Sequence, residues 1–145
     1  MTSLLPRLYS FRRYPYAMRA RLALLFAELP VELREIVLKN KPSQMLAISP
    51  KGTVPVLQLP EGRVIEESRE IMIWALEQND KQGLLDAKLI KQANDLLDKN
   101  DHEFKHWLDH YKYADRYPEM SQAEYQERGE VFLQSLETLL NKNAY

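Results

Sequence analysis

The sequence has 145 residues, and 45% of them are hydrophobic, so it can build a packed core and is not a globally disordered chain. Its 20 basic and 21 acidic residues leave a net charge of -1, which favours neither nucleic acid nor an anionic membrane as a partner. The printed sequence contains no cysteine, which excludes disulfides, thiolate zinc sites and cysteine catalysis within it. The start, Met1 to Arg7, lacks the apolar run of a signal peptide, and no stretch approaches a membrane span. We therefore expect a cytoplasmic protein.

The first segments of the chain predict a strand, a helix and a second strand. The strand-like run is Arg7 to Phe11, and Pro15 then opens a helical pattern that ends at Leu29 and Pro30. Residues Val31 to Leu38 are rich in Val, Ile and Leu and indicate the second strand. A strand, a helix and a strand within about thirty residues form a βαβ unit, so the two strands should be parallel.

The following segments predict a hairpin and another helix. An irregular stretch at 42–48 precedes two strands, at 54–59 and 63–65, that the turn Pro60-Glu61-Gly62 connects. Residues Ser68 to Gln78 have the apolar spacing of a helix. The order βαβ followed by ββα is that of an α/β thioredoxin-like domain, which we assign to residues 1–79.

Strand patterns stop after a polar linker at about 79–85. Apolar residues between Leu89 and Tyr111 fall on one broad helical face, and those between Tyr125 and Leu140 mark a last helix. We therefore expect residues 86–145 to form an all-α C-terminal domain.

Val54 and Pro55 stand where the third predicted strand begins. A cis bond here would turn the N–H and carbonyl of Val54 outward, where they could pair with a bound peptide like an added strand. A trans proline at a sheet edge is the alternative, and the residues alone leave both open.

Glu67 and Ser68 lie at the start of the last helix of this domain. The helix N–H groups and the Ser68 hydroxyl favour a carboxylate, and Glu67 can accept from an ammonium, so one site could hold both charges of a γ-glutamyl end. Plain capping of the helix is the alternative. Lys41 could pair with a terminal carboxylate, or it is a solvated surface lysine.

Tyr14 lies between the first strand and the first helix. An anion at this position would lie at a helix N-terminus and near Arg12 and Arg13. A phenol cannot form a disulfide, but it can donate a hydrogen bond to a bound thiolate. The alternative is an aromatic residue that fills space beside Tyr16.

As a set, these motifs resemble glutathione transferases of the omega-like, cysteine-using class. The runs that carry the resemblance are Tyr9 to Arg21, Leu38 to Pro42, Ser49 to Leu57 and the pair Glu67-Ser68. The resemblance implies a thioredoxin-like domain that binds glutathione, followed by a helical domain. It implies that Lys41 meets the glycyl carboxylate, that Val54 pairs with the cysteinyl backbone ahead of a cis Pro55, and that Glu67 and Ser68 hold the γ-glutamyl end.

The sequence departs from this family in two ways. Tyr14 stands at the position of the catalytic cysteine, so thiol transfer through a mixed disulfide cannot proceed there. Conjugation of glutathione to a hydrophobic electrophile through Tyr14 is the enzymatic expectation, and a non-catalytic glutathione-binding or protein-interaction module is the alternative. The helical domain is shorter than the family's, and the resemblance also implies a homodimer.

A different motif is present in the second half of the chain. His102, Glu103 and His106 match the H-E-x-x-H pattern of zinc proteases, in which two histidines bind zinc and the glutamate acts as base. His110 lies two helical turns beyond His102, roughly 12 Å away, which is too far for one tetrahedral ion. A zinc hydrolase is therefore a remote alternative, and a solvated histidine face is the expectation.

Overall fold

The computed structural model describes residues 4–143, which divide into two compact units, unit 1 (Met1–Asp86) and unit 2 (Ala87–Tyr145). The outermost residues of the two predicted domains, 1–3 and 144–145, lie outside the described part. No helix within residues 4–143 is both long enough and apolar enough to cross a membrane.

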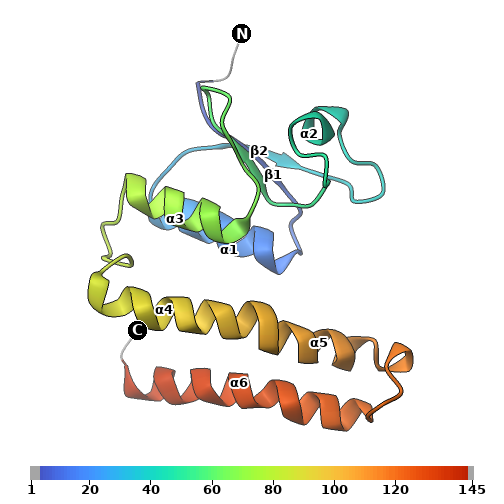
Figure 1. Ribbon diagram of the computed structural model, residues 1–145. Coiled ribbons are helices and arrows are strands. Elements are labelled where there is room, and N and C mark those ends of the chain that lie inside the picture. The colour runs from blue at the N-terminus through green and yellow to red at the C-terminus, as the bar shows by residue number, and fades with distance from the viewer. Residues whose placement is uncertain (1–3, 144–145) are drawn as a thin grey trace. The chain divides into compact units, whose positions relative to one another are not determined.

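Within these described residues, the strands of unit 1 form one four-stranded sheet in the order β2-β1-β3-β4 (Figure 1). The strands are β1 (Arg7–Ser10), β2 (Glu32–Glu35), β3 (Val56–Gln58) and β4 (Val64–Ile65). β1 and β2 run parallel, which confirms the predicted βαβ unit, and β3 pairs antiparallel with both β1 and β4. The predicted turn joins β3 to β4, and its Gly62 has a φ of +94°, a conformation that favours glycine.

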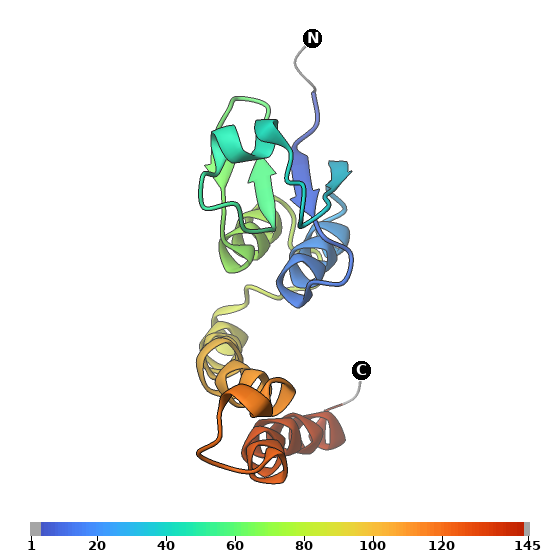
Figure 2. The same cartoon turned by 90° about the vertical axis from the view of Figure 1, so that its right-hand side faces the viewer.

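Helices cover both faces of this sheet. α1 (Pro15–Phe26) and α3 (Ser68–Gln78) lie side by side on one face, and α2 (Ser43–Ile48) lies on the other (Figures 1 and 2). Because side chains alternate along a strand, Leu8 packs toward α1 and α3, whereas Tyr9 packs with Met45 of α2. The result is the expected thioredoxin-like α/β arrangement.

The prediction of an irregular stretch at 42–48 was wrong, because Ser43 to Ile48 form the short helix α2. A helix of this length has too few turns to show a periodic pattern, and the fully buried side chain of Met45 attaches it to the sheet. β2 is also shorter than the predicted run from Val31 to Leu38, since the chain leaves the ladder after Glu35.

α1 ends at Phe26, before the predicted end at Leu29 and Pro30. Glu28 has a φ of +54°, and the Leu29 N–H donates to the Leu24 carbonyl over 3.0 Å. This bond pattern is a Schellman motif, in which a left-handed residue closes the helix.

Unit 2 is helical throughout its regular structure. Its elements are α4 (Ala87–Asp98), the π-helical turn η1 (Lys99–Phe104), α5 (Lys105–Lys112), the 3₁₀ turn η2 (Ala114–Arg116) and α6 (Gln122–Lys142). α6 runs back along η1 and α5 (Figure 1), and the rings of Phe104 and Phe132 lie 5.2 Å apart between them. The predicted single helical face is interrupted by η1, because a π turn adds a residue and rotates the side chains that follow.

Candidate functional site

Tyr14 is the residue immediately before α1, where the helix exposes N–H groups without intrahelical partners. Its own N–H donates to the Phe11 carbonyl over 3.1 Å, and its carbonyl accepts from the Met18 N–H over 2.9 Å. The phenol ring is half-buried and meets the Tyr16 ring edge-on, with centroids 5.4 Å apart. Pro15 supplies the fixed backbone angle of a first helical residue.

The loop that carries Tyr14 is held by Arg21 of α1. The Arg21 guanidinium donates to the buried Ser10 hydroxyl over 2.6 Å and to the Arg12 carbonyl over 2.8 Å. From the other side, the Arg12 N–H donates to the Glu35 carboxylate over 2.7 Å. The link between β1 and α1 is therefore tied both to the helix and to β2.

The segment Ser49–Pro55 connects α2 to β3 and contains the cis Val54–Pro55 bond, so the cis alternative is the one that the structure adopts. Gly52 has a φ of +66°, and a Cβ at this position would lie 3.4 Å from the Lys41 Nζ. Lys41 therefore lies directly over this loop.

Val54 has a buried side chain in the cluster that covers the α2 face of the sheet, and the Tyr14 ring packs against that same cluster. Among residues 4–143, neither the Val54 N–H nor its carbonyl has a hydrogen-bond partner. A main chain in this state can accept an added strand, because its polar groups have no competing protein bond.

Glu67 is the N-cap residue of α3, but its side chain makes no capping hydrogen bond. The capping alternative therefore does not describe this carboxylate. It pairs instead with the Lys51 ammonium, and this hydrogen bond raises the pKa of Lys51 against the opposing effect of its partial burial. The neighbouring Glu66 accepts from the buried Ser49 hydroxyl over 2.6 Å, which ties the same loop to the start of α3.

Ser68 opens α3 with a buried side chain. Its Oγ accepts from the Arg19 Nε of α1 over 2.9 Å, and the Arg19 guanidinium also lies 4.6 Å from the centroid of the Tyr16 ring. An oxygen that accepts from arginine keeps its own proton available, so the Ser68 hydroxyl can donate to an incoming anion.

Segment Ser49–Pro55 links most of the residues that the sequence singled out. It touches Lys41 through Gly52 and Glu67 through Lys51, and it shares a hydrophobic cluster with Tyr14 through Val54. One short loop thus carries the unpaired main chain of Val54, with the cation of Lys41 near Gly52 and the carboxylate of Glu67 on Lys51, which is the chemistry of a site for an extended, zwitterionic peptide.

The sequence did not single out two residues at this place, Arg19 and Lys51. Both lie within the runs that carry the resemblance, and each contacts a predicted site residue from another of these segments, Ser68 and Glu67 respectively. For Arg19, a further local signal was its position one helical turn after Tyr16, on the same face of α1.

The H-E-x-x-H motif of unit 2 has a different environment from a metal site. His102 and Glu103 lie in the π-helical turn, and His106 lies in α5 with its ring 4.1 Å from that of His110. His110 in turn stacks on Tyr117 at 3.7 Å. Among the described residues, no three His, Asp or Glu side chains gather in a way that could hold a metal ion, so the zinc hydrolase alternative has no support.

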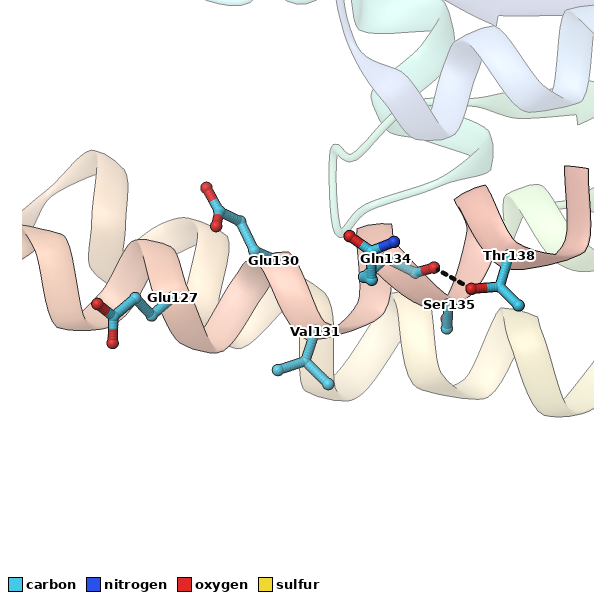
Figure 3. A pocket seen from close by; sticks show the side chains of 6 residues that line it. All are labelled: Glu127, Glu130, Val131, Gln134, Ser135 and Thr138. Carbon is cyan, nitrogen blue, oxygen red and sulfur yellow. Dashed lines mark hydrogen bonds between the residues drawn. The ribbon is translucent and has the colours of Figure 1, made fainter. Parts of the chain in front are cut away.

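A shallow depression of about 460 Å³ lies on α6, and none of the predicted site residues lines it (Figure 3). Its lining residues are Glu127, Glu130, Val131, Gln134, Ser135 and Thr138. The Thr138 hydroxyl donates to the Gln134 carbonyl over 2.9 Å, so that polar group is already used. All of the lining comes from one helix, and we assign no ligand to it.

Comparison with known proteins gives a family for most of unit 1. Residues 8–83 match the family model described as glutathione S-transferase, N-terminal domain. Pyrimidodiazepine synthase of Drosophila melanogaster is 34% identical over 94 residues, which make up 63% of this chain and 39% of that protein. Glutathione S-transferase omega-1 of Sus scrofa is 41% identical over 62 residues, 43% of this chain and 26% of that protein. The chain thus spans less than half the length of these relatives.

Solved structures share the fold. A glutathione transferase homologue from Sulfitobacter, solved with bound glutathione, superposes with a TM-score of 0.66. The superposition covers 96% of this chain and 68% of the other, at 17% sequence identity. At this identity the likeness shows the fold alone.

Proposed function

This chain belongs to the family of the glutathione S-transferase N-terminal domain, and from that premise we propose that its unit 1 binds glutathione. Lys41 pairs with the glycyl carboxylate, and the main chain of Val54, ahead of Pro55, pairs with the cysteinyl residue. Glu67 accepts from the γ-glutamyl ammonium, and Ser68 donates to the neighbouring carboxylate. The solved relative that holds glutathione supports the ligand, and the family membership supports the positions.

The observation that carries the proposal is the loop from Ser49 to Pro55. Its Val54 main chain has no hydrogen-bond partner among residues 4–143, although the side chain is buried. Lys41 lies close to Gly52 of the same loop, and Glu67 pairs with its Lys51. A tripeptide with a carboxylate at one end and a zwitterion at the other matches this order of groups.

The proposal includes a reaction at Tyr14. With the cysteinyl residue on Val54, its sulfur would lie toward the N-terminus of α1, because Tyr14 and Val54 share one cluster. The cysteinyl thiol would release its proton to solvent, and the phenol would donate a hydrogen bond to the thiolate that remains. That thiolate would attack a hydrophobic electrophile, forming a carbon–sulfur bond and breaking the bond to the leaving group, which departs with its electron pair. Thiol transfer through an enzyme-bound mixed disulfide is not part of the proposal, since a phenol has no sulfur to form it.

A non-catalytic glutathione-binding module is the second candidate. Tyr14 favours it, because the ring is half-buried against the Val54 cluster and can fill space without taking part in chemistry. An assay that couples glutathione to a chloronitrobenzene separates the two candidates, since only the enzyme accelerates formation of the coloured thioether.

A homodimer and a cytoplasmic location complete the proposal. Sedimentation of the purified chain tests the homodimer.

Calorimetric titration of glutathione into the intact chain tests the binding site. We expect saturable binding that Glu67→Ala weakens roughly three- to tenfold, because an exposed carboxylate that holds an ammonium contributes modestly. Glu61→Ala is the matched control, since Glu61 is an exposed glutamate in the turn between β3 and β4. A folded chain that binds no glutathione would overturn the proposed function.

A further inference from the structure

The carboxylate proposed to hold the ligand ammonium already holds an ammonium of the protein. Lys51 pairs with Glu67, and its side chain comes from the same loop as Val54. Lys51 lies 16 residues before Glu67 and in a different motif, so the sequence alone does not show this pairing. It bears directly on what the site can bind.

The surroundings of Lys51 are acidic. Glu67 is its hydrogen-bond partner, and Glu66 and Glu70 add further attraction, all of which raise the pKa of the Lys51 ammonium. Lys51 is therefore fully charged at neutral pH, and it lies where carboxylates gather. The other polar groups at the start of α3, Ser68 with its partner Arg19, suit an anion instead.

We infer that Lys51 is an internal competitor for the ammonium subsite, and that it sets the affinity of the site for ligands that carry an α-ammonium group. This inference rests on the proposed function. Two ammonium groups cannot both be held at full strength by one carboxylate, since they repel each other at hydrogen-bond distance. A γ-glutamyl ligand must therefore displace Lys51 or share Glu67 with it.

The exchange is energetically accessible. The side chains of Lys51 and Glu67 are 39% and 64% exposed, and a pair with this exposure contributes little to stability. A displaced Lys51 can remain near Glu66 or Glu70, which already attract it. The competitor therefore lowers ligand affinity without closing the site.

The test is a comparison of two ligands on three proteins by calorimetry. The ligands are glutathione and glutaryl-cysteinyl-glycine, which is glutathione without its α-ammonium group. The proteins are the intact chain, Lys51→Met and Lys81→Met. Lys81 is the matched control, because it is also an exposed lysine paired with a glutamate, Glu28, but that glutamate has no place in the proposed site.

We expect Lys51→Met to bind glutathione roughly two- to fivefold more tightly than the intact chain, the range of an exposed ion pair. Its affinity for the analogue should not increase, and Lys81→Met should behave as the intact chain toward both ligands. Unchanged or weaker binding of glutathione by Lys51→Met would overturn the inference and leave the proposed function standing. Failure of both the intact chain and Lys51→Met to bind glutathione would overturn the two together.

Discussion

Single side chains decide how the loop before α1 is held. Arg21 is the clearest case, because its guanidinium is the donor to the buried Ser10 hydroxyl and also binds the Arg12 carbonyl. We predict that Arg21→Met lowers the free energy of unfolding by about 1–3 kcal/mol, the usual cost of leaving buried polar groups without a charged partner. Urea denaturation measures this loss in the free energy of unfolding. Arg63→Met, at an exposed position, serves as the control, and an equal effect of both substitutions would contradict the prediction.

Arg19 is a second single side chain with a predicted effect, here on the affinity for the ligand. It fixes the Ser68 oxygen as an acceptor, which leaves the hydroxyl proton for an incoming carboxylate. We predict that Arg19→Met weakens glutathione binding about three- to tenfold. Calorimetry of the variant, with a thermal melt to show that it remains folded, measures the effect. Wild-type affinity in a folded Arg19→Met chain would show that this contact serves only the fold.

At the scale of elements, α6 has a complete capping box. The Ser121 hydroxyl accepts from the Glu124 N–H, and the Glu124 carboxylate accepts in turn from the Ser121 N–H over 2.7 Å. The bond from the Ser121 N–H, and second the bond that the Ser121 hydroxyl donates to the same carboxylate over 2.7 Å, lower the pKa of Glu124. A carboxyl group whose pKa is lower in the folded state stabilises the fold above its ordinary pKa, and this contribution is lost as the pH falls through the lowered value.

We therefore predict a pH-dependent effect for Ser121→Ala. At pH 7 the substitution should lower the melting temperature by a few degrees, because it removes the N-cap acceptor and the hydroxyl that donates to the charged Glu124, while the backbone N–H of residue 121 remains. The difference from the intact chain should shrink as the pH falls below the ordinary glutamate pKa of about 4 and through the lowered pKa of Glu124, because this carboxyl group then becomes protonated in the intact chain as well. Thermal melts followed by circular dichroism, at pH 7 and at acid pH, measure the melting temperatures of both chains. A difference in melting temperature that does not depend on pH would contradict this account.

The regular elements of the fold could be predicted from the sequence where apolar residues recur at a regular spacing. α3 was predicted with its observed bounds, since apolar residues recur along it at helical spacing, and Pro15 correctly marked the start of α1. α2 and the π-helical turn η1 could not be predicted. α2 is too short to show a period, and η1 continues the apolar spacing of the helices around it, so nothing in the pattern marks the π turn.

At the scale of the whole molecule, the end of unit 1, between α3 and α4, has local structure. Asp80 accepts from the N–H groups of Leu84 and Leu85, each over 2.7 Å, and Gly83 has a φ of +69° in the turn. We predict that Asp80→Ala increases the rate of tryptic cleavage after Lys81, because the turn opens more often when these bonds are removed. Glu77→Ala, an exposed change on α3, is the control, and equal cleavage rates in the two variants would contradict the prediction.

The candidate site shows the limit of sequence reasoning at this scale. Its motif residues were found by resemblance, because Val54, Glu67 and their neighbours keep a recognisable order along the chain. Arg19 and Lys51 were missed, since they meet Ser68 and Glu67 only after α1, α2 and α3 have packed. Partners that are 49 and 16 residues apart leave no local pattern to detect.

The phenol at position 14 also has a practical consequence. Because the printed sequence has no cysteine, every sulfhydryl in a mixture of this chain and glutathione belongs to the tripeptide. Ellman's reagent added to such a mixture would therefore titrate the tripeptide sulfur alone, without the background of protein thiols. The rate of that colour reaction, followed as the chain is added, would report whether the sulfur becomes shielded or more reactive beside Tyr14.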